Sequence, residues 1–273
     1  MVGHAPETSL IHVEGVDYSI SVFFPAFNDA ESLSVLIPKT VNVLKDLAKD
    51  YEVIVIDDGS TDETPAVLDR LTKEYPFLRT VRHPENRGYG AALRSGFQTA
   101  SRELVFYTDG DGQYDVGELR SLMAGLAEDV DVVNGYKIRR ADGLLRCLLG
   151  RFYQGLVRIF FGLKIRDVDC DFRLLRRRVL EAIPLSFSSG AICTELMSQI
   201  TRSGFRVKEV PVHHYPRSKG KSQFFRPLPV LQMLRDVLRL WVRLVLLRRA
   251  PRVAVGGTSP AHAVENPRPR VTR

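Results

Sequence analysis

Two hydrophobic periodicities alternate along the first 135 residues of the chain. Short apolar runs typical of strands are separated by longer segments in which apolar residues recur at helical spacing. Residues 51–56, YEVIVI, are apolar almost throughout, as in a strand covered on both faces. Strands are predicted at 18–24, 51–56, 78–82, 104–108 and 130–134, and helices at 32–49, 61–75, 88–100 and 116–127. This alternation predicts a doubly wound α/β fold, a mostly parallel sheet with flanking helices.

The second predicted helix, 61–75, carries a capping signal: Ser60 or Thr61 is placed to cap it, with acidic residues in its first turn. After residue 135 the pattern changes. Residues 144–163 are apolar but interrupted by three arginines, so they suit a membrane-spanning helix poorly. Helices are then predicted at 175–182 and 194–203, a strand at 206–212 and a basic loop at 215–226.

Residues 228–249 form a second apolar concentration, with a narrow polar arc. At helical spacing five polar residues fall within an arc of roughly 100°, and Leu and Val fill most of the rest. These residues are Gln232, Arg235, Asp236, Arg239 and Arg243. Such a pattern is typical of an amphipathic helix that lies in a membrane interface, and a helix pair packed on the domain or in a dimer is the alternative.

These patterns divide the 273-residue chain. Residues 1–17 are an N-terminal extension, 18–226 one α/β domain, 227–249 the amphipathic helix and 250–273 a disordered tail rich in Pro, Gly and Arg. Within the domain, residues 18–135 and 136–226 form two halves that differ in pattern. An apolar content of 44% with 26% charged residues excludes collagenous, fully disordered and polytopic membrane classes.

Cysteine usage and the N-terminus bear on location. The three cysteines lie far apart, which argues against a disulfide scaffold and a thiolate zinc site. The N-terminus pairs no basic flank with an apolar run, so no signal peptide is predicted and a cytoplasmic setting is expected.

Charge is distributed unevenly. Residues 1–136 hold 11 Lys and Arg against 23 Asp and Glu, a net charge of −12, and residues 137–273 hold 28 against 9, a net charge of +19. An acidic half suits metal ions, and a basic half attracts phosphates or an anionic membrane surface. The pI near 9.4 also fits nucleic acid, but no recognised nucleic-acid-binding module is present, so no nucleic-acid partner is expected.

Polar residues follow three of the predicted strands. The first strand runs into PAFND (25–29), the second into DDGS (57–60) and the fourth into DGDGQ (109–113). In open α/β sheets ligands bind beyond the carboxyl ends of the strands, so a parallel sheet brings these motifs to one edge.

Asp109 and Asp111 form a D-x-D pair on a glycine-containing loop. Two carboxylates this close repel each other unless a divalent cation lies between or beside them. Oxygen ligands favour Mg²⁺ or Mn²⁺, which also bridge to substrate phosphates. Alternatively, one aspartate caps the helix at Val116 and the other is solvated.

Two further motifs have two interpretations each. Asp57 and Asp58 are either turn and capping residues or the carboxylates that bind a base or ribose. The segment NRGYGAA (86–92) opens a helix with small residues, which either cradle a phosphate or permit close packing.

Together, PAFND, VIDDGSTD, NRGYGAA and TDGDGQ, in this order and spacing, resemble the inverting family 2 glycosyltransferases, and within them the polyprenyl-phosphate (dolichyl-phosphate) sugar synthases. The resemblance covers about residues 18–225, and it implies that 18–135 is the nucleotide-sugar-binding half of the domain and 136–226 the acceptor-binding half. It implies the GT-A fold, a Rossmann-like nucleotide-binding sheet, with a nucleotide-sugar donor, a divalent metal and inversion at the anomeric carbon.

The resemblance also implies roles for single residues. Pro25, Phe27 and Asp29 line the nucleoside pocket, with Asp29 where the family commonly has Glu. Ile56 and Asp58, with Asp57 beside them, contact the base or ribose. Asp109 and Gly110 hold the nucleotide sugar, and Asp111 and Gln113, with Asp109, bind Mg²⁺ or Mn²⁺.

The segment VDCDFR (168–173) resembles the acceptor-side D-x-x-F-[RK] pattern of the family. Arg173 then pairs with a phosphate, and Asp169 or Asp171 lies at the reacting centre. A hydroxyl acceptor requires one of these aspartates to take its proton, whereas a lipid phosphate does not. The alternative is a structural Asp–Arg pair.

Residues 213–223 resemble a basic loop that closes over the diphosphate. Arg217 is its expected phosphate ligand, and Lys219 or Lys221 takes the place of the Lys in the usual Ser-Lys ending, which here is Ser222-Gln223. A solvated run of charges is the alternative. Lys137, Arg139 and Arg140 are further candidates for a phosphate or an interfacial charge.

We therefore expect a metal-dependent enzyme that moves a sugar from a GDP-mannose or UDP-glucose type of donor to a polyprenyl phosphate or another lipid-linked acceptor. It is expected to lie peripherally on the cytoplasmic face of the membrane. A sugar or lipid hydroxyl acceptor is the main alternative, and an inactive nucleotide-sugar-binding module is a remote one.

Overall fold

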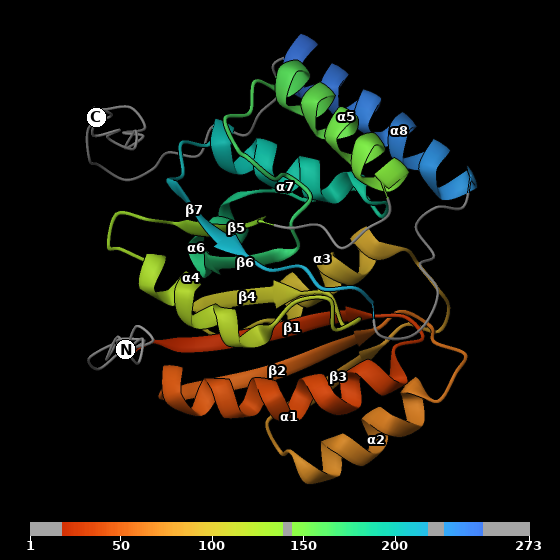
Figure 1. The fold of residues 1–273 in the computed structure, drawn as a ribbon, viewed down its shortest axis with the longest axis vertical. Coiled ribbons are helices and arrows are strands. Elements are labelled where there is room, and N and C mark those ends of the chain that lie inside the picture. The colour runs from red at the N-terminus through yellow and green to blue at the C-terminus, as the bar shows by residue number, and fades with distance from the viewer. Residues whose placement is uncertain (1–17, 139–143, 218–226, 248–273) are drawn as a thin grey trace, which may run out of the picture.

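Seven strands form one sheet in the part of the chain that the computed structural model describes, residues 18–138, 144–217 and 227–247 (Figure 1). The strands are β1 (Ser19–Ala26), β2 (Asp50–Asp57), β3 (Leu78–Arg82), β4 (Leu104–Thr108), β5 (Val132–Lys137), β6 (Phe172–Arg176) and β7 (Val207–Val212). Their order across the sheet is β3-β2-β1-β4-β6-β5-β7. All neighbours pair in parallel except β6, which is antiparallel to β4 and β5. The predicted α/β class is confirmed.

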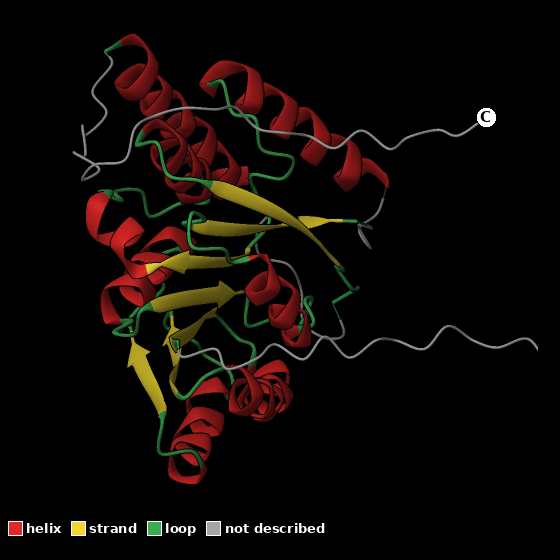
Figure 2. Cartoon of the chain, turned by 90° about the vertical axis from the view of Figure 1, so that its left-hand side faces the viewer, coloured by secondary structure: helices red, strands yellow, loops and turns green. Residues whose placement is uncertain are grey.

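Helices cover both faces of this sheet (Figure 2). They are α1 (Ala30–Leu47), α2 (Thr64–Glu74), α3 (Tyr89–Thr99), α4 (Leu119–Gly125), α5 (Leu144–Phe161), α6 (Arg177–Ala182), α7 (Ala191–Arg202) and α8 (Pro227–Trp241). Side chains alternate along each strand, so Phe24 packs in one core with α1, α2 and α4, and Phe23 in the other with α3 and α5 to α8. The helices packed in these two cores hold the sheet in place from both faces, including the edge at which the motifs lie.

The structure corrects three predicted elements. Residues 172–176 form the unpredicted strand β6, and the helix predicted from residue 175 begins only at Arg177. The helix predicted at 116–127 divides into a 3₁₀ turn, Val116–Glu118, and α4. α2 begins at Thr64 without an acidic first turn; Asp62 accepts a hydrogen bond from the Thr64 N–H, so neither Ser60 nor Thr61 caps it.

The predicted extension 1–17, the predicted disordered tail 250–273 and the loop residues Lys219 and Lys221 lie outside the described residues, as do Arg139 and Arg140. The predictions for these segments stay predictions.

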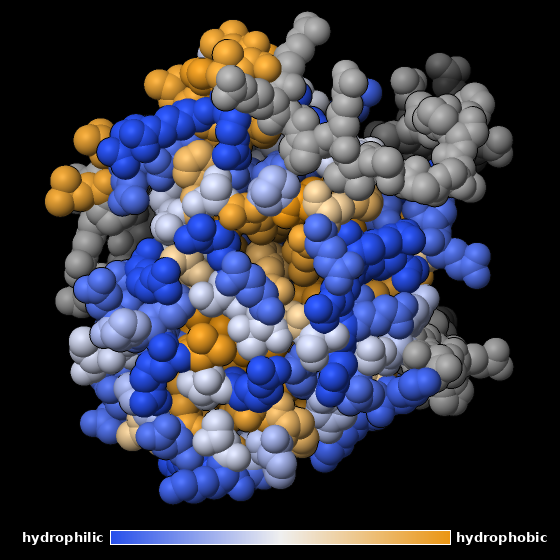
Figure 3. Space-filling view, turned by 180° about the vertical axis from the view of Figure 1, so that it is seen from behind, coloured by the Kyte–Doolittle hydropathy of each residue, from blue (hydrophilic) through white to orange (hydrophobic). Residues whose placement is uncertain are grey.

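α5 and α8 lie side by side (Figure 1), and apolar side chains on them form a surface that no other described element covers (Figure 3). The outward side chains on α5 are Phe152, Leu156, Ile159 and Phe160, and those on α8 are Leu228, Leu231, Leu234 and Leu238. Exposed fractions reach 78% at Ile159 and 79% at Leu228. None of the described helices is both long and apolar enough to span a bilayer.

Candidate active site

Three loops at the carboxyl ends of β1, β2 and β4 are joined directly to one another. The backbone N–H of Asp58 donates to the carbonyl of Ala26 at 2.9 Å, and that of Gly110 donates to the carbonyl of Pro25 at 3.1 Å. β1 lies between β2 and β4, so its end ties both neighbouring loops in place. The three motifs do lie at one edge of the sheet, as a parallel arrangement predicts.

Asp29 closes the first loop. Its Oδ2 accepts from the N–H of Phe27 at 3.0 Å, and its Oδ1 accepts from Nη2 of Arg217 at 2.8 Å. Burial raises the pKa of Asp29 to about 6, although the Phe27 N–H and Arg217 both act to lower it. The residue expected in the nucleoside pocket is therefore a desolvated carboxyl with a cation beside it.

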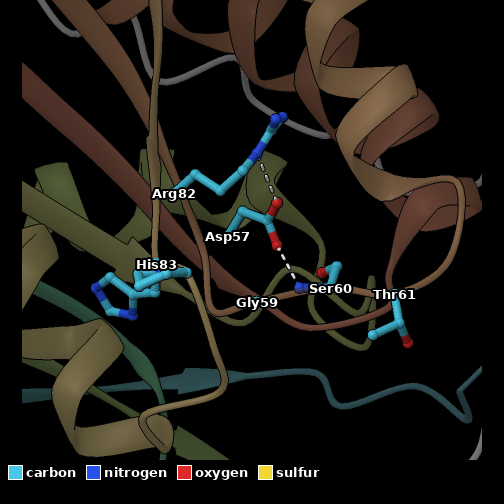
Figure 4. A pocket seen from close by; sticks show the side chains of 7 residues that line it. Asp57, Gly59, Ser60, Thr61, Arg82 and His83 are labelled. Carbon is cyan, nitrogen blue, oxygen red and sulfur yellow. Dashed lines mark hydrogen bonds and ion pairs between the residues drawn. The ribbon is translucent and has the colours of Figure 1, made fainter.

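A hollow of about 410 Å³ opens beyond β2 and β3 (Figure 4). It is lined by Asp57, Gly59, Ser60, Thr61, Arg82, His83 and Pro84. Asp57 bridges its walls: one oxygen accepts from the Ser60 N–H at 2.9 Å and the other from Nε of Arg82 at 3.1 Å. The sequence analysis did not identify Arg82 and His83. The signal that could have pointed to them is their position at the end of a short predicted strand.

Asp58 faces the opposite way and shapes the loop before α3. Its carboxylate accepts from the N–H groups of Arg87, at 3.0 Å, and Gly88, at 2.9 Å. The buried imidazole of His83 joins Asp58, at 2.5 Å from Nδ1, to Ser95 on α3, at 2.9 Å from Nε2. Asp57 and Asp58 are both buried, and Ile56 and Pro25 lie in the sheet beside them. These four residues form the wall and floor behind the loops, and their side chains have little surface to offer a ligand.

The D-x-D loop is held by a tyrosine from α3. Tyr89 donates its hydroxyl proton to Oδ1 of Asp109 at 2.9 Å, and the N–H of Gln113 donates to Oδ1 of Asp111 at 3.0 Å. Burial raises the pKa of Asp109 well above its usual range, and repulsion from Asp171 and Asp111 raises it further. Tyr89 lies in the NRGYGAA motif, so that motif packs closely and also holds the sugar-binding aspartate that the sequence predicts.

The antiparallel direction of β6 brings the acceptor segment to the same place. Phe172, the first residue of β6, pairs with Thr108, the last residue of β4, so Asp171 and Asp109 are neighbours across the strand pair. Asp171 accepts from the Sγ–H of Cys193 at 3.2 Å. The donor-side and acceptor-side carboxylates predicted from separate motifs therefore share one site.

Arg173 does not fit its expected role as a phosphate ligand. Its side chain is fully buried, and its Nε donates to Oδ1 of Asn134 at 2.6 Å. The two Nη groups donate to the Tyr107 hydroxyl and the Val168 carbonyl. With the Asp171 carboxylate 3.7 Å away, Arg173 is the structural partner of an aspartate, and no face of its guanidinium is open to a substrate.

A second cation, Lys137, lies beside the acceptor segment. Nζ of Lys137, at the end of β5, donates to the carbonyl of Asp169 at 2.7 Å and lies 3.7 Å from Oδ2 of Asp167. Asp167 also accepts from the side-chain amide of Gln154 on α5 and from the N–H of Asp169. Asp167 escaped the sequence analysis because the recognised acceptor segment begins one residue later. Burial raises the pKa of Asp169 to about 6, and Asp167 and Asp171 reinforce that rise.

The segment after β7 closes the site on its remaining side. The Tyr215 N–H donates to the Gln113 carbonyl at 2.8 Å, and the Gln113 side chain donates to the Tyr215 carbonyl at 3.0 Å. Nη2 of Arg217 then lies 2.8 Å from Asp29 and 3.7 Å from Oδ2 of Asp111. Arg217 thus joins the first loop to the D-x-D loop, and its role as a diphosphate ligand stays a prediction.

The chemistry of this edge fits a divalent cation. Asp109 and Asp111 repel each other, and this repulsion helps to raise the pKa of Asp109. The guanidinium of Arg217 lies 3.7 Å from Oδ2 of Asp111, so the site already places one positive charge beside this carboxylate. The described residues contain no group of three or more His, Cys, Asp or Glu side chains placed to hold a metal by themselves. Asp111, Asp109 and the Gln113 amide oxygen would hold such a cation only together with water or substrate phosphate as further ligands.

Comparisons with known proteins agree with this arrangement. The family model described as "Glycosyl transferase family 2" matches residues 21–183. "Glycosyltransferase AglD" of Haloferax volcanii is 32% identical over 242 residues, which are 85% of this chain and 38% of that protein. "Undecaprenyl-phosphate 4-deoxy-4-formamido-L-arabinose transferase" of Enterobacter sp. (strain 638) is 31% identical over 209 residues, 76% of this chain and 63% of that protein. The chain thus spans less than two thirds of either relative.

Solved structures share the fold. Glucosyl-3-phosphoglycerate synthase from Mycobacterium tuberculosis, in complex with Mn²⁺ and uridine-diphosphate-glucose, aligns with a TM-score of 0.62 at 21% identity. The alignment covers 82% of this chain and 78% of that one. The same enzyme in complex with Mg²⁺ and uridine-diphosphate aligns with a TM-score of 0.61.

Proposed function

The chain belongs to glycosyl transferase family 2, and on that premise we propose that it transfers a sugar from a nucleotide diphosphate sugar to a polyprenyl phosphate at a membrane surface. The observation that carries the proposal is the pairing of β4 with β6, which sets the donor-side Asp109 beside the acceptor segment 167–171 and its cation, Lys137. The relatives named as undecaprenyl-phosphate transferases support the choice of acceptor.

On the donor side, Asp29 and the hollow beyond β2 and β3 take the nucleoside, and Asp109 and Gly110 hold the sugar end. Arg217 and Lys219 neutralise the diphosphate from the loop after β7. Asp111, with Asp109 and Gln113, would hold Mg²⁺ or Mn²⁺, which would supply positive charge where charge develops on the leaving nucleoside diphosphate.

On the acceptor side, Lys137 holds the lipid phosphate. Its side chain is only 10% exposed and its ammonium group is fixed by the Asp169 carbonyl, so it loses little freedom on binding an anion. A phosphate oxygen then attacks the anomeric carbon opposite the leaving group, which inverts the configuration. The phosphate is already an anion and needs no general base.

A hydroxyl acceptor is the second candidate, and one observation favours it. The pKa of Asp169 is raised to about 6 by burial, which suits a carboxyl that takes a proton near neutral pH. Asp171, beside Asp109, is the other candidate base. If Asp171→Asn abolishes turnover and leaves donor binding intact, the hydroxyl acceptor is supported.

The deciding experiment is a panel of nucleotide sugars with Mn²⁺ or Mg²⁺, incubated with undecaprenyl phosphate and scored for released nucleoside diphosphate. Release that depends on the lipid is expected. Lys137→Gln raises KM for the lipid phosphate and leaves nucleotide affinity unchanged, whereas Lys164→Gln, at an exposed lysine, changes neither. Release that is the same with and without the lipid contradicts the proposed acceptor.

The exposed leucines of α8 and the apolar side chains of α5 support a peripheral membrane location. We propose that this apolar surface lies in the lipid interface. Leu231→Glu combined with Leu238→Glu should prevent flotation with anionic vesicles, because both side chains are more than 60% exposed on α8. Val35→Glu is the control, since Val35 is 67% exposed on α1. Unchanged flotation of the α8 variant contradicts the location.

A further inference from the structure

Two buried carboxylates anchor the C-terminal helix on the domain. Asp236 of α8 accepts from the Ser189 hydroxyl at 2.9 Å. Glu195 of α7 is fully buried and forms an ion pair with Arg243, which lies in the π-helical turn Val242–Leu246 after α8. Glu195 is fully buried whereas the Arg243 side chain is 37% exposed, so loss of Arg243 removes the cation beside a buried carboxylate and leaves that carboxylate with hydrogen bonds from residues 186 and 187.

Both anchors act on one short segment, the connector of residues 186–190. Glu195 accepts from the N–H of Ser186 at 2.9 Å and from that of Phe187 at 3.1 Å. Arg243 donates to the Ser186 hydroxyl at 3.1 Å, and its guanidinium lies 5.5 Å from the centre of the Phe187 ring. The connector is therefore held by charges that come from α7 and from the turn after α8.

The other side of the connector contacts the start of α3. The Gly90 N–H donates to the Ser188 carbonyl at 2.8 Å, and Arg94 donates to the Ser186 carbonyl at 3.1 Å. A Cβ on Gly88 would lie 2.7 Å from the Ser188 carbonyl oxygen, and one on Gly90 would lie 2.5 Å from that of Phe187. This backbone contact is too close for any side chain, so the position of the connector sets that of the helix start.

The start of α3 in turn holds the donor side of the site. Tyr89 donates to Asp109, and the Gly88 N–H donates to Asp58. We propose that Arg243 and Glu195 are positioning residues for the nucleotide-sugar site, acting through the connector and Tyr89 on Asp109. The inference rests on the proposed function in one respect: it takes Asp109 as part of the donor site.

The test compares Arg243→Gln with Arg239→Gln in the full chain. Arg239 lies on α8, four residues before Arg243, and is 62% exposed; its carboxylate contact is Asp236 at 3.6 Å, so the control removes the same charge without removing a contact to Glu195 or Ser186. Hydrogen exchange at the start of α3 should become roughly tenfold faster or more in Arg243→Gln, since loss of the Gly90 contact lowers the cost of local opening. Arg239→Gln should exchange as the wild type does.

The second readout is the affinity for UDP and for GDP in the presence of Mn²⁺. We expect Arg243→Gln to weaken the affinity for the nucleotide that the wild type binds, and Arg243→Lys to restore part of it because the lysine keeps a charge beside Glu195. If Arg243→Gln does not fold, Ser189→Ala, which removes the Asp236 anchor, is measured in the same way.

The outcomes separate this inference from the proposed function. Faster exchange confined to the connector and α8, with the start of α3 unchanged, overturns the positioning role. A wild type that binds neither nucleotide counts against the donor site instead, and hydrogen exchange still decides the contact chain from Arg243 to Tyr89.

Discussion

Replacement of Arg173 by leucine tests whether this arginine is structural or contacts substrate. Arg173 is fully buried, and the variant leaves the Asn134 side-chain oxygen and the Val168 carbonyl without their donor. Each buried acceptor left unsatisfied costs about 1–3 kcal/mol. Asp171 also loses its nearby cation, and removal of one partner of a buried ion pair costs about 3–5 kcal/mol. These contributions overlap, so we expect a total loss of about 3–5 kcal/mol in the free energy of unfolding.

The assay is urea unfolding followed by circular dichroism. With a slope of about 3 kcal/mol per M, the midpoint should fall by about 1–2 M. Arg178→Leu is the matched control: Arg178 pairs with Asp131 at 2.6 Å but is 60% exposed, and such a pair contributes about 1 kcal/mol at most. If Arg173→Leu unfolds at the wild-type midpoint and instead raises KM for the lipid phosphate, the structural assignment of Arg173 is wrong.

Three further predictions concern the site. Tyr89→Phe removes the hydrogen bond to Asp109, and because an ordinary hydrogen bond contributes about 0.5–1.5 kcal/mol, kcat/KM for the donor should fall roughly two- to tenfold, with an unchanged value contradicting the contact. Asp111→Ala should abolish activity that EDTA also abolishes, while the melting temperature stays nearly unchanged, and activity that persists in EDTA would refute the metal site. The pKa of Asp29 is about 6 in the folded protein, above its usual 3.8, so the folded protein binds the Asp29 proton more tightly than the unfolded chain does. Protonated Asp29 therefore contributes its full stabilisation below about pH 4, and this stabilisation is lost as the pH rises through 6. Between pH 4 and pH 8 the free energy of unfolding, measured with urea, should change by about 2–3 kcal/mol less in Asp29→Asn than in the wild type, and identical profiles would contradict the pKa shift.

The sequence predicted the parallel part of the sheet well because its signals are local. β3 and β4 have the predicted bounds, since short apolar runs between polar segments have few alternative structures. β6 was missed because FRLLR leads directly into the helix at Arg177, and the leucines at 174 and 175 suit either structure.

The site residues likewise divide into those that local sequence signals could place and those that they could not. Loops that follow strands could be placed at one edge from their order alone. The sequence left Arg173 open between a phosphate ligand and a structural Asp–Arg pair, and it could not decide between them because the partners Asn134 and Tyr107 come from other segments of the chain. The hydroxyl of Tyr89 on Asp109 likewise joins residues 20 positions apart. Burial of a polar group among distant partners leaves no trace in local periodicity.

Because β6 runs antiparallel to β4, the loops after β1, β2 and β4 and the segment before β6 reach the site from different parts of the chain. Their sequences can therefore change independently. β1, β2 and β4 deliver their loops as they leave the sheet, whereas the segment 162–171 arrives at the same edge before its strand begins. Insertions or deletions between α5 and β6 can thus reshape the wall around Asp171 while the register of Thr108 against Phe172 stays fixed. In such an architecture, acceptor choice can diversify through the length and sequence of one segment without any change in the loops that face the donor.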